Sequence, residues 1–101
     1  MTTRRDPNRR PTHPGAILRD DVLPSIPMTQ TECARRLGVS RLTISEILLE
    51  KRAISPDMAL RLGEMLGNGP DVWLRMQQAL DLWELRQAKA ADYAAIERVA
   101  A

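Results

Sequence analysis

Apolar residues recur three and four positions apart along most of the chain, and valine, isoleucine and threonine nowhere alternate as they would in a β-strand. Glycine, proline and residues that favour helix ends interrupt this periodicity at intervals. The interruptions predict an all-α domain of five helices over residues 13–86, with its central pair at residues 29–49. A basic arm at residues 1–12 is expected to be disordered, and an alanine-rich helical tail is expected at residues 87–101.

The first helix of the central pair is predicted to begin after Thr29. Glu32 follows three residues later, and this spacing is typical of a capping box, in which the threonine hydroxyl accepts from the Glu32 amide and the carboxylate reaches back to the Thr29 amide. Gly38 is expected to end the helix, because glycine readily adopts a left-handed backbone. The apolar face of this helix carries Cys33, Ala34 and Leu37.

The second helix of the pair is predicted to be capped by Ser40. Its buried stripe consists of Ile44, Ile47 and Leu48. Two helices joined by so short a segment must cross steeply, and the small Ala34 leaves room where they lie closest. The pair therefore predicts a helix-turn-helix, with an ordinary helical hairpin as the alternative.

Proline and capping residues mark the flanking helices. His13-Pro14-Gly15 opens the first helix, which is expected to end before Pro24. Ser55, Pro56 and Asp57 suit the cap and first turn of the fourth helix, which is expected to run to about residue 66.

The fifth helix, predicted to start at Pro70 and Asp71, has more apolar positions than one buried stripe requires. Trp73 is assigned to the core of the domain. The apolar residues beyond this stripe predict a second apolar face of the fifth helix, which contacts another copy of the chain. The candidates for this dimer interface are Met76, Leu80 and Trp83. A chain of 101 residues buries only a modest core, so dimerisation would add stability.

Composition narrows the class of protein. The one cysteine allows no intramolecular disulfide, which is typical of a reducing compartment. No apolar segment approaches the length of a membrane span, and the N-terminus is polar and rich in arginine rather than a secretory signal. We therefore expect a cytoplasmic protein with no membrane partner.

The basic charge is unevenly distributed. The net charge is only +2, but residues 1–12 carry four arginines against one aspartate, and residues 29–52 carry five basic against three acidic side chains. Residues 53–101 are slightly acidic, with five basic against seven acidic side chains. This asymmetry predicts a protein with DNA at one end and a different partner at the other, and a plain solvated surface is the alternative for the C-terminal part. For the basic arm, phosphate or protein binding and a simple solvated tail remain alternatives.

The exposed side of the second motif helix is predicted to bind DNA, because the N-terminal part of this helix enters the major groove in helix-turn-helix complexes. The candidates for base contacts are Arg41, Leu42, Thr43 and Ser45, and Ser40 stands beside Arg41 at the N-terminal tip of the helix. Glu46 either accepts from a cytosine amine or repels phosphate. The candidates for phosphate contacts lie at the start of the first motif helix and after the second: Thr29, Gln30, Thr31, Lys51 and Arg52.

Catalytic chemistry is not indicated. One histidine and one cysteine cannot form a metal cluster, so no metal and no cofactor are expected. Cys33 has no predicted base beside it and is assigned to the core, while His13 is assigned to local capping or packing. No carboxylate pair or nucleophile–base pair has useful spacing, and we expect that the protein is not an enzyme.

Four blocks together resemble the HigA-type antitoxins of bacterial toxin–antitoxin modules, within the lambda-repressor-like group of helix-turn-helix proteins. They are His13-Pro14-Gly15, the motif TQTECARRLGVSRLTISEIL, the segment ISPDMALRL at residues 54–62, and the pair PDVWL and LDLW at residues 70–83. The resemblance implies a homodimer that binds the palindromic operator of its own operon. It also implies neutralisation of a small RelE-like toxin that cleaves mRNA. DNA-binding positions carry over to Thr29, Gln30, Ser40, Arg41, Leu42, Thr43 and Ser45.

Two positions depart from the family pattern. The family often has a polar residue, commonly glutamine, where this chain has Leu42, which favours a more apolar contact. The family also often has Asn-Gly after the recognition helix, where this chain reads Leu49-Glu50-Lys51. The turn must then be made differently, and a glutamate close to phosphate would be unfavourable.

Two other functions remain open at this point. The chain could be an interaction protein that neutralises a toxin but has little affinity for DNA, and Leu42, Glu46 and Glu50 favour this alternative. It could also be a stand-alone phage-type transcriptional regulator without a toxin partner.

Overall fold

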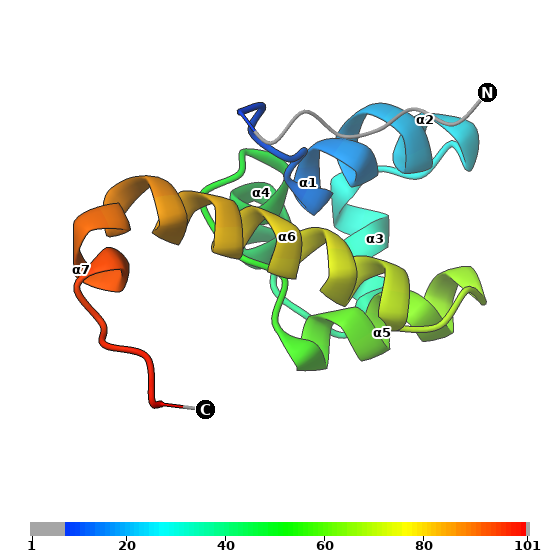
Figure 1. Ribbon diagram of the computed structural model, residues 1–101. Helices are drawn as coiled ribbons and strands as arrows, with labels where there is room; N and C mark the ends of the chain where they lie inside the picture. The colour runs from blue at the N-terminus through cyan, green and yellow to red at the C-terminus, as the bar shows by residue number, and fades with distance from the viewer. Residues whose placement is uncertain (1–7, 101) are drawn as a thin grey trace, which may run out of the picture.

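The computed structural model describes residues 8–100, and within this range the regular secondary structure is helical throughout (Figure 1). The predicted all-α fold is thereby confirmed. The elements in chain order are α1 (Pro14–Ile17), η1 (Leu18–Val22), α2 (Leu23–Ser25), α3 (Gln30–Leu37), α4 (Arg41–Leu48), α5 (Pro56–Leu66), α6 (Asp71–Ala88) and α7 (Ala90–Ala94).

The first helical segment continues through Pro24, so the expected end before this proline is wrong. α1, η1 and α2 follow one another without a break, and η1 is a turn of π-helix. The Leu23 amide donates to the Leu18 carbonyl five residues back. Proline lacks an amide hydrogen, and its ring clashes with the carbonyl four residues earlier in a regular α-helix. The wider π turn directly before Pro24 is a recognised way for a helix to absorb such an interruption.

The predicted helix caps are present in the structure. Thr29 Oγ1 accepts from the Glu32 amide at 3.1 Å, and Ser40 Oγ accepts from the Thr43 amide at 3.0 Å. The Ser55 hydroxyl accepts in the same way from the Met58 amide, at the start of α5. Each hydroxyl satisfies one of the amides that a helix leaves unpaired at its start.

The buried core lies where the helices converge. α6 packs against α5 and α1, and α3 packs against both α4 and α5. The core is largely aliphatic, and its residues include Leu18, Leu37, Ile44, Ile47, Leu62 and Trp73. Trp73 is 2% exposed, as predicted for a residue of the core.

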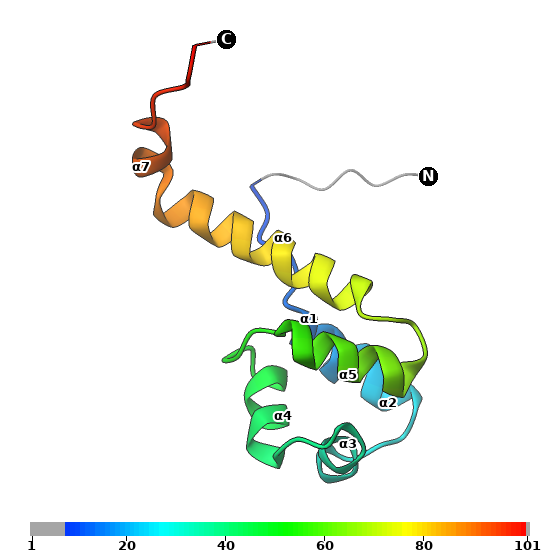
Figure 2. The ribbon, with the colours of Figure 1, turned by 90° about the horizontal axis from the view of Figure 1, so that it is seen from below.

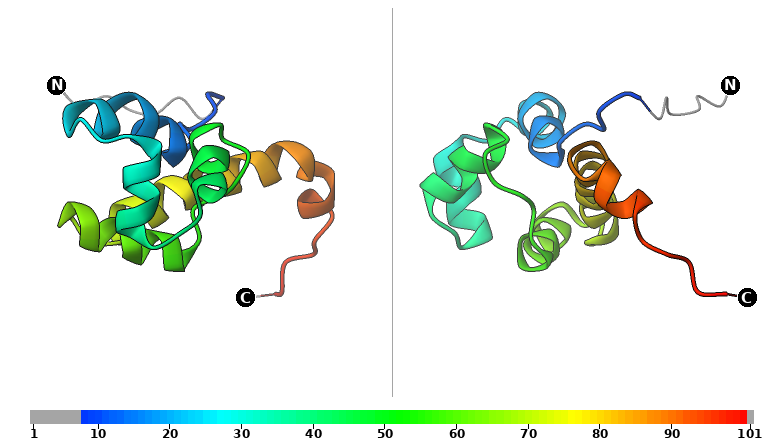
Figure 3. Two further views of the ribbon diagram at one scale, coloured as in Figure 1. Left: turned by 180° about the vertical axis from the view of Figure 1, so that it is seen from behind. Right: turned by 60° about the vertical axis from the view of Figure 1, so that its left-hand side comes forward.

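The molecule is elongated, with α3 and α4 at one end and the C-terminal part of α6 with α7 at the other (Figures 2 and 3). α6 extends to Ala88, and α7 ends at Ala94. Residues 95–100 are not helical, so the predicted helical tail at 87–101 is wrong over these six positions. These six residues are all exposed, so no packing against the domain stabilises a helix there.

The basic arm reaches the domain through Arg10. Residues 1–7 lie outside the described part of the chain, so the expected disorder of this segment stays a prediction. Arg10 Nη1 lies 3.4 Å from Glu50 Oε1, and its Nη2 lies 3.2 Å from Glu84 Oε1. The next residue, Pro11, is buried. Residues 10–11 are therefore held against the domain, contrary to the expected disorder of the whole arm.

Candidate nucleic-acid interface

A tight turn joins α3 to α4, as predicted. Gly38 has a φ of 72°, in the left-handed region, and the Val39 amide donates to the Ala34 carbonyl at 3.0 Å. This hydrogen bond satisfies a carbonyl at the end of α3. Ala34 is 4% exposed and Ile44 is fully buried, so the inner faces of the two helices belong to the core. The outer faces of α3 and α4 are left available to a ligand.

The outer face of α4 presents most of the predicted base contacts. Ser40, Arg41 and Leu42 are exposed, and Leu42 is 67% exposed. Thr43 and Ser45 are half-buried at the sides of the helix. The hydroxyls of Ser40 and Thr43 lie 2.8 Å apart and share a hydrogen bond, so both are engaged at the helix cap. Arg41 and Leu42 are consequently the side chains that project freely from the first turn.

The predicted phosphate contacts at the start of α3 share one surface. Thr29, Gln30 and Thr31 are all exposed. The Thr29 hydroxyl is engaged with the Glu32 amide, as a cap requires. Backbone amides of the first turn and the positive end of the helix dipole favour an anion at this position.

Glu32 departs from the predicted capping box. Its carboxylate does not reach back to the Thr29 amide; it accepts from Arg35 Nη2 at 2.6 Å and from Arg36 Nε at 2.9 Å. Hydrogen bonds from Arg35 first and Arg36 second lower the pKa of Glu32 from 4.5 to about 2. The guanidinium groups are stronger partners than a backbone amide, because these hydrogen bonds join opposite charges.

The basic side chains of the motif differ in how they are held. Arg35 and Arg36 pair with Glu32, and Arg52 Nη2 lies 2.9 Å from Glu46 Oε1. Arg41 and Lys51 are exposed and form no ion pair within residues 8–100. Arg41 and Lys51 are therefore the cations of the motif that an anionic ligand meets uncompensated.

Glu50 makes the turn after α4 that the sequence left unexplained. Its φ is 62°, and it has the only positive φ among the described residues other than glycine. Its carboxylate lies 3.4 Å from Arg10 Nη1 and 3.5 Å from Arg19 Nη1. The expected unfavourable approach of this glutamate to phosphate is thus offset by two arginines.

Arg19 and Arg61 position the motif, and the sequence analysis missed both. Arg19 Nη1 donates to the Leu48 carbonyl at 2.9 Å, at the end of α4. Arg61 Nη1 donates to the Leu37 carbonyl at 2.8 Å, at the end of α3. An aspartate four residues before Arg61 could have indicated an ion pair within α5, but no sequence signal indicates a contact with α3.

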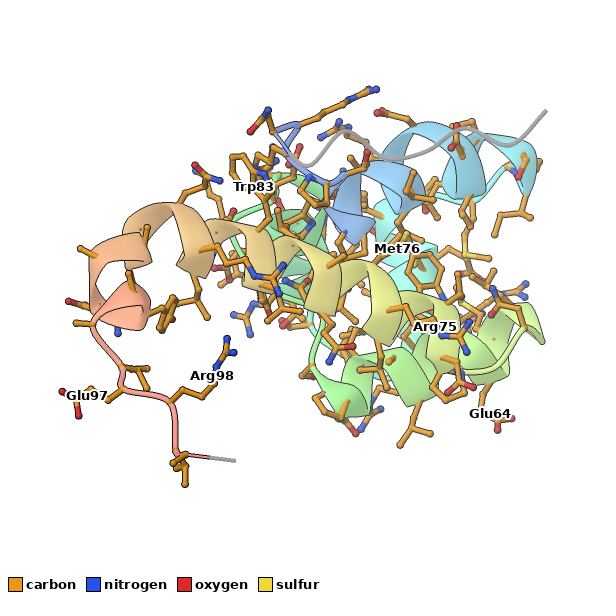
Figure 4. All side chains as sticks on the ribbon, viewed as in Figure 1. Glu64, Arg75, Met76, Trp83, Glu97 and Arg98 are labelled. Atoms are coloured by element: carbon orange, nitrogen blue, oxygen red, sulfur yellow. The ribbon has the colours of Figure 1, made fainter. Side chains whose placement is uncertain are left out.

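The predicted dimer residues differ in their exposure along α6, on which Figure 4 labels Met76 and Trp83. Leu80 is only 2% exposed within the single chain, so its assignment to the dimer interface is wrong. Met76 is half-buried against the core, and Trp83 is half-buried further along the helix. The exposed apolar residues at this end are instead Leu82, Leu85, Tyr93, Ile96 and Val99. Periodicity alone could not separate the two faces, because both carry leucine.

Within residues 8–100 the structure offers neither a metal-binding cluster nor a membrane-spanning helix. No group of three or more histidine, cysteine or acidic side chains lies close enough to hold a metal ion. Over the same range, none of the helices has the length and apolar character needed to cross a membrane.

Known proteins resemble this chain in both sequence and structure. The model of the helix-turn-helix family matches residues 28–73. Antitoxin HigA-1 of Vibrio cholerae is 35% identical over 82 residues, which span 81% of this chain and 77% of that protein. The chain belongs to the HigA-type antitoxin family of helix-turn-helix proteins. The resemblance inferred from its four sequence blocks is thereby confirmed.

Solved structures of similar antitoxins include complexes with DNA. Antitoxin GraA in complex with its operator has a TM-score of 0.84 and 37% identity, over 92% of this chain and 95% of that one. The Pseudomonas aeruginosa antitoxin HigA with the higBA promoter has a TM-score of 0.83 and 36% identity, over 90% of this chain and all of that one. The fold of this HigA-type antitoxin is therefore one that other proteins use on DNA.

Proposed function

We propose that this antitoxin represses its own operon and neutralises the toxin encoded beside it. In this proposal a homodimer binds the palindromic operator with α4 in the major groove and the start of α3 against the phosphate backbone. The same protein forms a complex with a RelE-like toxin that cleaves mRNA. The observation that carries the DNA part is the exposed, unpaired Arg41 on the first turn of a capped α4.

Each exposed group of the motif has a role in this proposal. Arg41 donates in a bidentate manner to guanine, and Leu42 packs against a thymine methyl. Ser40 at the N-cap and Thr43 and Ser45 on the flanks of α4 contribute shorter polar contacts. Phosphate contacts come from the groups on either side, namely Thr29, Gln30, Thr31, Lys51 and Arg52.

The relatives support both parts of the proposal. GraA and the Pseudomonas aeruginosa HigA, both of which resemble this chain over at least 90% of its length, have been solved with operator or promoter DNA. The name antitoxin, shared by HigA-1, supports a toxin as the second partner. The RelE-like fold of that toxin is inferred from the family resemblance alone.

The DNA part is tested by replacing Arg41. The duplex upstream of the chain's own gene is titrated at physiological salt, with fluorescence anisotropy as the readout. Arg41→Ala should lose a bidentate contact to guanine, and the free energy of operator binding should weaken by on the order of 1–3 kcal/mol. Arg75→Ala is the matched control, because Arg75 is exposed on α6 and should leave binding unchanged.

Two results would contradict operator binding. One is wild-type protein that binds its own upstream DNA no more tightly than a random duplex. The other is Arg41→Ala protein that retains wild-type affinity. The first result would favour the interaction protein with little DNA affinity, an alternative to which the largely exposed, apolar Leu42 gives some support.

The toxin part is tested by co-expression with the product of the neighbouring gene. We expect the two proteins to co-purify and the antitoxin to restore growth of cells that express the neighbour alone. Operator binding without co-purification and without restored growth would instead favour a stand-alone phage-type regulator.

A further inference from the structure

Glu46 lies at the centre of the outer face of α4. At about 100° per residue, it stands opposite the buried stripe of Ile44, Ile47 and Leu48 and beside Leu42. In the proposed complex this face enters the major groove between two phosphate backbones. A carboxylate there is repelled by the phosphates unless it gains a specific partner.

Arg52 already compensates the charge of Glu46 in the free protein. Its Nη2 donates to Glu46 Oε1 at 2.9 Å, and the two side chains are 47% and 32% exposed. Arg52 belongs to the loop between α4 and α5, so the pair links the loop to the recognition helix. The contact also limits the positions that the carboxylate can take.

The second oxygen of Glu46 remains available for a ligand. Among the residues that the structure describes, no donor contacts Glu46 Oε2. Arg52 likewise retains donors, because a guanidinium carries five N–H groups and the bond to Glu46 uses one Nη2. The pair can therefore accept one hydrogen bond from a base while donating to a phosphate.

We propose that Glu46 determines sequence specificity by accepting a hydrogen bond from the exocyclic amine of cytosine, with Arg52 as its positioning residue. This inference rests on the proposed operator binding. Only cytosine N4 and adenine N6 are donors in the major groove, and adenine places its N7 acceptor beside the amine. A carboxylate cannot donate to N7, so cytosine is the favoured base.

The alternative is an ion pair with a structural role only. Exposed pairs of this kind contribute little to stability. Such a pair would not alter the preference for one base over another, so base preference at single positions distinguishes the two explanations.

The test compares wild-type protein with Glu46→Gln on a set of operators in which each base pair of a half-site is changed in turn. Glutamine both donates and accepts, and it pairs in a bidentate manner with adenine. We expect the preference at one position of the half-site to move from cytosine towards adenine by roughly tenfold, the scale of one good base contact. Glu64→Gln is the control, because Glu64 is an exposed acid on α5 (Figure 4).

Arg52 is tested by its effect on the same position. Arg52→Ala should lower the discrimination for cytosine there, and Arg52→Lys should restore part of it. A role in phosphate binding alone would weaken all operators equally and leave the discrimination unchanged, which would overturn the positioning role.

The outcomes separate this inference from the function on which it rests. If wild-type protein binds its operator specifically and Glu46→Gln keeps the wild-type preference at every position, the role of Glu46 is refuted and operator binding stands. If wild-type protein has no preference for its operator, both are refuted. Thermal unfolding of each variant, followed by circular dichroism, verifies that the variant is folded.

Discussion

Glu50 is the residue at which the chain departs most clearly from local preference. A side chain with a Cβ is disfavoured at its φ of 62°, and glycine is the usual residue in such a turn. Two contacts from sequence-distant residues offset this cost, because Arg10 and Arg19 both lie within ion-pair distance of the carboxylate. The turn after the recognition helix is therefore coupled to the N-terminal segment.

His13 provides a second case of a residue whose role depends on its surroundings. Its Nδ1 accepts from the Gly15 amide at 2.8 Å and caps α1, and the residue is 4% exposed. Burial is the largest cause that lowers the pKa of His13 from 6.5, and Arg10 acts in the same direction. The groups that act in the opposite direction are Glu50, the Arg52 backbone and Glu84. The neutral ring is thus the form that suits the fold.

The stability of the domain should consequently fall as the pH is lowered through 6.5. The unfolded chain then binds a proton at His13 that the folded chain binds only at lower pH, and protonation favours the unfolded state. Urea denaturation between pH 8 and pH 5.5 measures the change. His13→Asn is the control, because asparagine is a good helix cap that does not titrate in this range. Equal pH dependence of the two proteins would contradict the role of His13.

At the scale of the elements, Arg61 connects α5 to the end of α3. Its Nη1 donates to the Leu37 carbonyl at 2.8 Å, and its Nε donates to Asp57 Oδ2 at 2.9 Å. The first contact satisfies a carbonyl that the end of a helix would otherwise leave to water. One side chain thus helps to fix the motif on the rest of the domain.

Arg61→Ala should lower the free energy of unfolding by about 1 kcal/mol, below the usual 1.5–3 kcal/mol for a charged hydrogen bond because the side chain is 41% exposed. Chemical denaturation measures this change. Arg86→Ala, at an exposed position on α6, should leave the stability unchanged. A loss of equal size in both variants would mean that the contact with Leu37 contributes nothing specific.

At the scale of the whole molecule, the proposed homodimer requires a surface that can join two copies. Leu82 and Leu85 are 43% and 44% exposed, and they lie three residues apart on one face of α6. This face lies on the part of α6 that projects away from α3 and α4 (Figure 2). We propose this face as the dimer interface, because it lies away from α3 and α4, and the proposed complex needs both recognition helices free to reach half-sites about 34 Å apart.

Leu85→Glu should convert the protein from dimer to monomer, because it places two like charges near the two-fold axis of an apolar contact. Analytical ultracentrifugation measures the change, and operator affinity should fall with it. Leu60→Glu is the matched control, since Leu60 is 56% exposed on α5. A Leu85→Glu protein that remains dimeric would place the interface elsewhere.

The sequence by itself determined the features that depend on neighbouring residues. The caps at Thr29, Ser40 and Ser55, the left-handed Gly38 and the buried stripe of α4 all follow from side chains within four positions of one another. Helical periodicity and local hydrogen bonds act over this same range, and for that reason they could be predicted. The resemblance of the four blocks to HigA-type antitoxins added the family.

Only the tertiary structure decided the features that depend on distant segments. It buried Leu80 inside the single chain and directed the Glu50 carboxylate to Arg10 and Arg19. It also brought Arg61 to the end of α3. The partners of Glu50 and Arg61 lie 24 or more residues away along the chain, and for Leu80 periodicity carries no information on which faces meet. The proposals depend on Arg41, which forms no ion pair within residues 8–100, and on Glu46, which pairs with Arg52. Neither property could be recognised without the tertiary structure.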